Sequence, residues 1–265
     1  MNETRKRTRT VRIALLLGGA ETSRPALQLL TQLAWKKSVQ ALGIFIEDST
    51  LLTLAQMPFS RELCRVTFTE RPLEKADIER QLRIQARGAQ LAFENAATEA
   101  GIVHSFRTMR GAMAALLQQA AQEMDLLILG PARRQRQFSE PISLSAIARL
   151  SRLPVMVLFD GSESSLRALD AARQLAETGN RRLTVLISAD NGEESLARQR
   201  QAALRLGNYS ASYRFAANCD IETLLQTGRD ENAGTLVLGV SEALLQPRFL
   251  EELSSLLEIP ALLVR

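Results

Sequence analysis

Two short stretches of the sequence gather side chains that could bind a ligand. The first is Asp160-Gly161-Ser162, which ends an apolar run and opens an amphipathic stretch. A carboxylate and a hydroxyl at such a point could face a ligand. They could equally form a tight strand-to-helix turn, in which the Asp or Ser side chain accepts hydrogen bonds from helix amides. Both interpretations are open from the residues alone.

The second stretch combines arginines and serines ahead of a predicted helix. Its members are Arg133, Arg134, Arg136, Ser139, Ser143 and Ser145. Guanidinium groups, hydroxyls and a helix N-terminus could together bind an anion. The alternative is a solvated basic loop with a serine N-cap.

The sequence argues against catalysis. Its only histidine, His104, falls in a predicted strand, so a two-histidine zinc helix is excluded and a Ser-His-Asp triad would depend on this one residue. The nucleophile elbow, the P-loop and the dinucleotide fingerprint are all missing from the sequence. We therefore expect a structural role for His104 and a protein that is not an enzyme, with no metal site.

The chain contains an internal repeat. Residues 155–176 align without a gap with residues 13–34, and in both copies an apolar run passes through a glycine turn into a stretch ending Gln-Leu-Ala. The run that ends at Gly130 likewise parallels the run that ends at Gly239. A repeat this long indicates two related α/β units.

The predicted organisation is a basic tail over 1–11, a first unit over 12–153 and a second unit over 154–265. Alternating helices and continuous apolar strands predict a parallel sheet that is covered on both faces. Strands are predicted at 12–18, 39–47, 102–108, 125–130, 154–160, 182–188, 208–216, 234–239 and 259–264. Helices are predicted at 22–36, 78–100, 112–123, 143–151, 163–177, 192–206, 220–228 and 247–257.

Composition fits two modest globular domains, because 46% of the 265 residues are apolar and 23% are charged. The net charge of +4 permits an acidic partner, but much of the excess crowds the N-terminus, where a solubilising tail is expected in preference to membrane or nucleic-acid contact. No apolar run approaches the roughly 18 residues of a membrane span. Cys64 and Cys219 fall at unrelated places and are interpreted as reduced thiols, and the predicted location is cytoplasmic.

A family resemblance rests on the second unit's first turn. A strand that ends in Asp-Gly-Ser-Glu-x-Ser resembles the first strand and turn of the universal stress protein family, and the residues from Asp160 to Ser165 fit it. The runs DLLILG and LPVMVL are similar to that family's fourth and fifth strands. The resemblance covers 12–265 as two degenerate copies. It implies two tandem doubly wound parallel-sheet units of strand order 3-2-1-4-5, closely docked.

The resemblance also implies a nucleotide site. Many family members bind ATP through an aspartate after the first strand and through a motif Gly-x-x-Gly-x9-Gly-Ser/Thr after the fourth. Glycines there let backbone amides approach phosphate oxygens. The candidate contacts in this chain are therefore Asp160, Gly161, Ser162, Gly239, Gly130, Arg133, Arg134 and Ser143.

Both units depart from that motif. In the first, Gly18 replaces the aspartate, Arg133 stands at the second glycine's position, and Ser143-Leu144 replaces Gly-Ser. In the second, Glu242 takes the second glycine's position and the shorter loop has no Gly-Ser. We therefore predict decayed nucleotide sites.

The first unit carries an insertion near 48–80. Its apolar side chains are Leu51, Leu52, Leu54, Met57, Phe59, Leu63 and Val66. An insertion of this length in a compact domain is usually functional or flexible. It could cover the ligand crevice of its own unit, or it could bind a partner.

One predicted strand could be assigned to either of the two units. Residues 155–159 align both with the last strand of the second unit and with the first strand of the first unit. Because the Asp160 turn and its helix follow at once, we assign them to the second unit. The first unit then lacks a fifth strand, and its open edge needs the second unit or another chain.

From these observations we expect a cytoplasmic stress-response protein that binds an unknown protein partner, as a homodimer or a tightly docked tandem. The alternative is a regulatory switch that binds ATP or another adenine nucleotide. Nucleic acid is not the expected partner.

Overall fold

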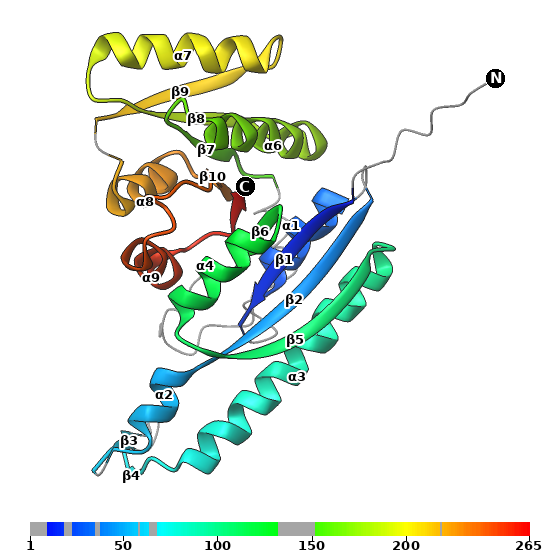
Figure 1. The fold of residues 1–265 in the computed structure, drawn as a ribbon, viewed down its shortest axis with the longest axis vertical. Helices are drawn as coiled ribbons and strands as arrows, with labels where there is room; N and C mark the ends of the chain where they lie inside the picture. Colours follow the sequence, from blue (N-terminus) through cyan, green and yellow to red (C-terminus); the bar gives the residue numbers. More distant parts are fainter. Residues whose placement is uncertain are drawn as a thin grey trace, which may run out of the picture.

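The computed structural model describes residues 10–18, 23–34, 38–57, 59–63, 68–131, 152–217 and 219–265. Its centre is one nine-stranded sheet of order β5-β2-β1-β6-β11-β10-β7-β8-β9 (Figure 1). The strands of this sheet are β1 Val11–Leu17, β2 Val39–Asp48, β5 Val103–Gly111, β6 Leu126–Leu129, β7 Val155–Phe159, β8 Leu183–Ser188, β9 Ala211–Ala216, β10 Thr235–Gly239 and β11 Ala261–Val264. The predicted α/β class with a mostly parallel sheet is confirmed.

Helices cover both faces of this sheet. Their bounds are α1 Arg24–Ala34, α2 Ser49–Leu54, α3 Lys75–Glu99, α4 Met113–Glu123, α6 Glu163–Gly179, α7 Gly192–Leu206, α8 Ile221–Asp230 and α9 Pro247–Leu256. The predicted helix over 143–151 and the tail over 1–9 lie outside the described residues.

The protein has two hydrophobic cores, one on each face of the sheet. Successive strand residues point to opposite faces, so Ile13 and Leu15 join one buried cluster while Ala14 and Leu16 join the other. The first cluster packs under α1, α3 and α6, and the second packs under α4, α8 and α9. Each cluster contains residues from both halves of the chain, so the halves share their cores.

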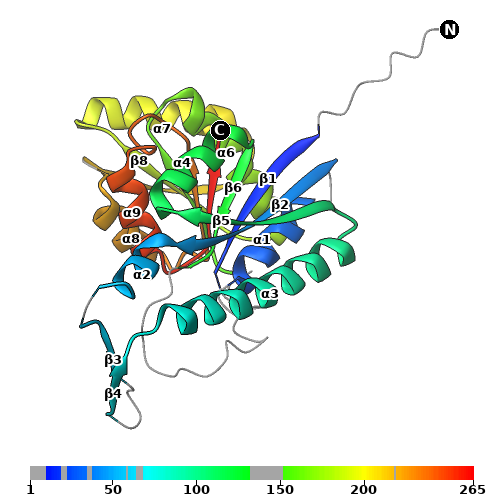
Figure 2. The ribbon, with the colours of Figure 1, turned by 60° about the horizontal axis from the view of Figure 1, so that its bottom comes forward.

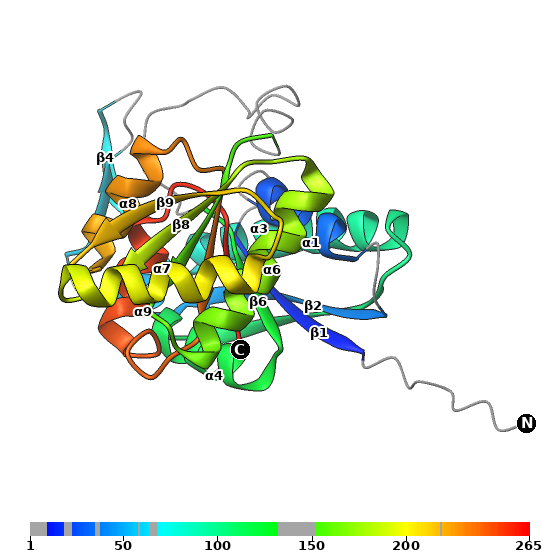
Figure 3. The same ribbon diagram turned by 90° about the horizontal axis from the view of Figure 1, so that it is seen from above.

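The halves meet at an antiparallel pair. Strand β6 pairs with β11, from Ala261 opposite Leu129 to Val264 opposite Leu126. The C-terminus therefore lies in the middle of the molecule (Figures 1 and 3). Helices α1 and α6 contact each other across this junction, as do α4 and α9. The two predicted units thus form one continuous sheet.

Residues 155–159 lie only in the second half, where β7 pairs with β10 on one side and β8 on the other. Reading β7 as its first strand, the second half runs 3-2-1-4-5 from β9 to β11. The first half runs only 3-2-1-4, from β5 to β6, and β11 closes its edge.

The insertion forms secondary structure that was not predicted from its sequence. No helix or strand was predicted between residues 48 and 77, but these residues make the short helix α2 and a small antiparallel hairpin of β3 Arg61–Leu63 and β4 Glu70–Pro72. We call α2 with this hairpin the arm. Helix α2 packs against α3, and the hairpin extends away from the sheet instead of crossing the carboxyl ends of β1 and β6 (Figure 2).

Helix α3 ends as predicted. Its buried stripe consists of Leu82, Ala89, Phe93 and Ala97, and Gly101 follows the helix with φ of 65°. Glycine adopts this left-handed conformation without steric cost. Within the described ranges, no helix is both long and apolar enough to cross a membrane.

Candidate functional site

The candidate site of the second half lies at the carboxyl ends of β7 and β10, which are neighbours in the sheet. The turn after β7 holds Asp160, Gly161 and Ser162. Gly239 is the last residue of β10, and the loop that follows holds Glu242. Ligands of open parallel sheets bind in the crevice outside such strand ends.

Hydrogen bonds within the turn already use the Asp160 and Ser162 side chains. The Ser162 amide donates to Asp160 Oδ1 at 2.9 Å, and the Ser165 amide donates to Ser162 Oγ at 3.1 Å. Ser162 is thus the N-cap of α6. The structure therefore shows the capping arrangement, which leaves the second carboxylate oxygen of Asp160 to be considered for a ligand.

The turn holds Asp160 in its ionised form. Partial burial raises the pKa of the carboxyl, but hydrogen bonds from the Ser162 side chain and backbone and from the Ser165 side chain outweigh it. The pKa of Asp160 therefore lies below its ordinary value. A negative charge persists here, next to helix amides that favour it.

Gly161, the middle residue of the turn, faces two side chains of α7. Gly161 has φ of 82°, a conformation that other residues rarely adopt. A Cβ built on it would lie 3.3 Å from Gln201 Oε1 and 3.5 Å from Arg198 Nε. Arg198 also pairs with Glu194 at 2.7 Å and donates to the Ser188 carbonyl. Periodicity did not single out Arg198 or Gln201, because their proximity to the turn depends on how α7 packs.

Gly239 has a packing role. A Cβ at this position would lie 2.4 Å from Ser164 C and 2.6 Å from Ser165 N, both backbone atoms of α6. No side chain can be accommodated there unless the helix moves. This close approach explains the glycine without any ligand.

The loop after Gly239 offers few free amides to a phosphate. Val240 N donates to the Val264 carbonyl at 2.7 Å, while Leu244 N and Leu245 N donate to Ser241 at 3.3 and 3.0 Å. The next helix, α9, starts with Pro247, which has no N–H. Glu242 is exposed in the same loop and adds negative charge. This arrangement opposes phosphate binding.

The first half shows only part of its predicted site. Gly130 directly follows β6 and corresponds in the repeat to Gly239, the last residue of β10. Arg133, Arg134 and Ser143 lie outside the described residues, so their proposed anion contact stays a prediction.

Two further reactive side chains, those of His104 and Cys219, have structural surroundings, whereas Cys64 lies outside the described residues. His104 Nδ1 lies 2.9 Å from the Ile102 carbonyl oxygen, and its ring packs edge-on against Phe93. Burial, together with the charge of Asp220, raises the pKa of the Cys219 thiol to about 12. Among the residues that the structure describes, no group of His, Cys, Asp and Glu could hold a metal ion.

Comparison with solved structures identifies the architecture. A universal stress protein from Archaeoglobus fulgidus aligns over 96% of this chain and 96% of its own, with 12% identity and a TM-score of 0.55. The fold is that of the universal stress proteins. No protein-family model and no curated protein sequence matches the chain.

Shorter universal stress proteins align with part of the chain. A family member from Burkholderia pseudomallei covers 43% of this chain and 96% of its own, with 22% identity and a TM-score of 0.34. A universal stress protein in complex with cAMP covers 43% of this chain and 97% of its own, with 23% identity and a TM-score of 0.37. The full-length alignment with the Archaeoglobus fulgidus protein confirms, at the level of the fold, the resemblance predicted from Asp160-Gly161-Ser162.

Proposed function

We propose that this chain is a non-catalytic protein of the universal stress type that works inside the cell by binding a protein partner through its arm. The observation that carries the proposal is the exposure of large apolar side chains on the arm. Phe59 is 97% exposed and Phe68 is 78% exposed. Leu54, Met57 and Leu63 of the same segment of the chain are also exposed.

The backbone of the arm supports the same proposal. Phe59 and Phe68 have φ of 77° and 53°, a region that non-glycine residues rarely adopt. Such conformations persist where the surrounding structure holds them, and they cluster at binding sites. The hairpin itself is held by an exposed Arg61–Glu70 pair at 3.3 Å and by a hydrogen bond from Leu73 N to the Ser60 carbonyl. Its apolar side chains are therefore presented on a formed scaffold.

The partner that fits this surface is a protein with an apolar groove. Aromatic side chains are the usual anchors of protein interfaces, where each fills a pocket of the other surface. Exposed apolar groups that are not scattered singly mark interaction sites.

Crosslinking in cells tests the arm. A photoreactive phenylalanine analogue placed at Phe59 should give a discrete adduct, and the same analogue at Leu204, an 84% exposed apolar residue on α7, should not. Replacing Phe68 by Ser should weaken the adduct formed from position 59. Equal adducts from positions 59 and 204, or none from either arm position, would reject the arm as the binding surface.

The alternative function is a switch that binds an adenine nucleotide. The ionised Asp160 at the end of β7 favours it, because this carboxylate could address a base. The paired loop amides, Pro247 and Glu242 oppose it. Calorimetric titration with ATP, AMP and cyclic nucleotides separates the two functions. We expect ATP binding weaker than about 100 μM and no hydrolysis, whereas low-micromolar binding would favour the switch.

A further inference from the structure

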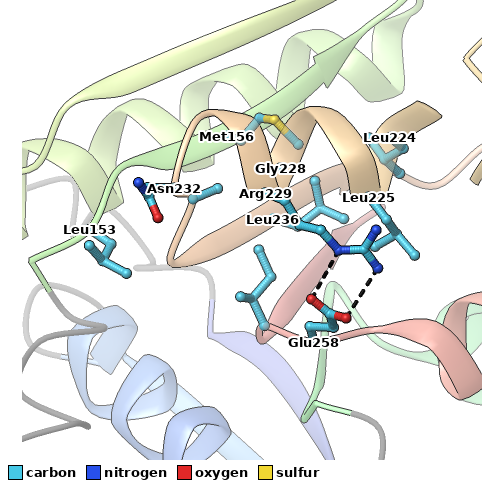
Figure 4. Close-up of a pocket in the computed structure, with 11 residues that line it drawn as sticks. Leu153, Met156, Leu224, Leu225, Gly228, Arg229, Asn232, Leu236 and Glu258 are labelled. Atoms are coloured by element: carbon cyan, nitrogen blue, oxygen red, sulfur yellow. Dashed lines mark hydrogen bonds and ion pairs between the residues drawn. The ribbon is translucent and has the colours of Figure 1, made fainter. Parts of the chain in front are cut away.

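A separate cavity lies at the opposite end of the same two strands. It has a volume of about 270 Å³ and opens between α8, the starts of β7 and β10, and the connection from α9 to β11 (Figure 4). Met156 and Leu236 contribute its strand side, and Leu224 and Leu225 contribute its helix side. Asp160 and Gly239 are not among its lining residues, so it is distinct from the candidate nucleotide crevice.

The interior of the cavity is apolar. Met156, Leu224 and Leu236 are each at most 1% exposed to solvent, yet they border open space. Apolar cavities of about 150 Å³ are already large enough to hold a benzene ring. A partly open cavity nearly twice that size can accommodate a larger ring system or a short branched chain.

The rim supplies polar groups without a net charge. Arg229 Nε and Nη2 each donate to a Glu258 carboxylate oxygen at 3.1 Å, so the two charges neutralise each other (Figure 4). The side chain of Asn232, an exposed residue, also lines the cavity at its rim. It can donate to or accept from one polar group of a bound molecule.

Gly228 is the most informative residue of the lining. It is buried near the end of α8, where a glycine costs roughly 0.5–1 kcal/mol relative to alanine. Packing does not require it, because an added Cβ would meet only the flexible end of Met156, at 3.4 Å. The absence of a side chain at position 228 therefore does not serve the helix. Its structural effect is to leave the cavity open.

We propose that this cavity binds a small, uncharged, mainly apolar molecule that carries one hydrogen-bonding group. The apolar part would lie against Met156 and Leu236, and the polar group would face Asn232. The class includes aromatic rings that bear a hydroxyl or an N–H. This inference does not depend on the arm.

Methyl NMR with indole as the probe tests the proposal on the full-length chain. The protein contains six methionines, so ¹³C-methyl labelling gives a report at Met156 with internal controls elsewhere. The Met156 signal, assigned with a Met156→Leu variant, should shift saturably as indole is added, because a ring bound against this methyl changes its magnetic environment. The other methionine signals should stay in place.

Variants at one position make the test specific. Gly228→Leu would fill the cavity and should weaken indole binding at least about tenfold. Gly228→Ala should weaken it several-fold while the melting temperature stays equal or rises, which guards against a folding defect. The matched control is Gly192→Ala in α7, where an added Cβ has nothing within 4 Å and indole affinity should not change.

The proposal is overturned if Met156 shows no saturable shift up to the solubility limit of indole. It is also overturned if Gly228→Ala and a folded Gly228→Leu bind indole as the wild type does. A shift confined to other methionines would place the bound indole elsewhere and would reject this cavity.

Discussion

The first half of the sheet ends at β6, whereas the second half continues past β10 to its own last strand, β11. Both halves share the order of the strands before that point. Strand β11 pairs in parallel with β10 and antiparallel with β6, so one strand closes both halves. An unpaired sheet edge exposes backbone donors and acceptors and invites aggregation. The comparison indicates that the second half can complete its sheet alone, whereas the first half depends on it.

The largest expected effect follows from separating the halves. Residues 12–153 expressed alone should aggregate or stay poorly folded, because β6 and the apolar faces beside it lose β11, α6 and α9. Residues 154–265 keep all five of their strands, so this fragment should aggregate less and fold better than the first. Size-exclusion profiles and thermal melts of both fragments provide the measurement. A monomeric first fragment with a sharp cooperative transition would contradict the dependence of the first half on β11.

Alanine substitutions at two glycines, one in each half, compare how tightly the two halves are packed. Gly239→Ala should destabilise the protein by about 3 kcal/mol, the upper end of the usual cost of overpacking, because its Cβ would meet the backbone of α6. Gly43→Ala in the first half should cost less. The nearest atoms to its Cβ would be ring atoms, of Phe106 at 2.8 Å and of the buried Phe93 at 2.9 Å, and a side-chain ring yields at lower cost than the backbone of a helix.

Urea unfolding of these two variants measures the difference, with Gly192→Ala as the variant in open space. The packing role of Gly239 is rejected if Gly239→Ala costs no more than Gly43→Ala.

A smaller loss of stability is expected when Asp160 is substituted. The corresponding position in the first half holds Gly18. Asp160→Asn should cost no more than about 1 kcal/mol, because the turn keeps the Ser162 cap. The folded pKa of Asp160 lies below the unfolded value. Its contribution to stability is therefore present above the unfolded pKa and is lost as the pH falls through the folded pKa.

Thermal melts of wild type and Asp160→Asn from about pH 7 to about pH 2 measure this dependence. The difference between the two should shrink toward the acid end. A difference that grows in acid would show that the carboxylate is not stabilised in its ionised form. Loss of a measured adenine-nucleotide affinity with an unchanged melt would assign Asp160 a binding role.

The smallest expected effect is on the chemical reactivity of Cys219, the thiol of the second half. With a pKa of about 12, Cys219 should be almost wholly protonated near pH 8 and should react slowly with iodoacetamide. Mass spectrometry of a Cys64→Ser variant follows this one thiol. Unfolding in guanidinium should raise the rate by restoring an ordinary pKa. Equal rates in the folded and unfolded protein would show that burial does not protect the thiol.

Much of the local structure could be predicted from the residues. Continuous apolar runs and helical periodicity predicted most strands and helices, and a capped turn was one of the two interpretations that Asp160-Gly161-Ser162 left open. The arm was missed as structure because β3 and β4 are three residues each, too short to show a period. The role of Gly239 was also missed, since a glycine at a strand end could serve a phosphate or a helix equally well.

The sequence by itself determined the α/β alternation, the repeat and the absence of a second histidine, because these depend on residue order alone. Only the tertiary structure decided that β11 closes the first half at β6, that Gly239 lies against the backbone of α6, and that an open cavity remains beside Gly228. Those features depend on contacts between residues far apart in the chain. Local periodicity records which face of a strand or helix is buried, but not which distant segment buries it.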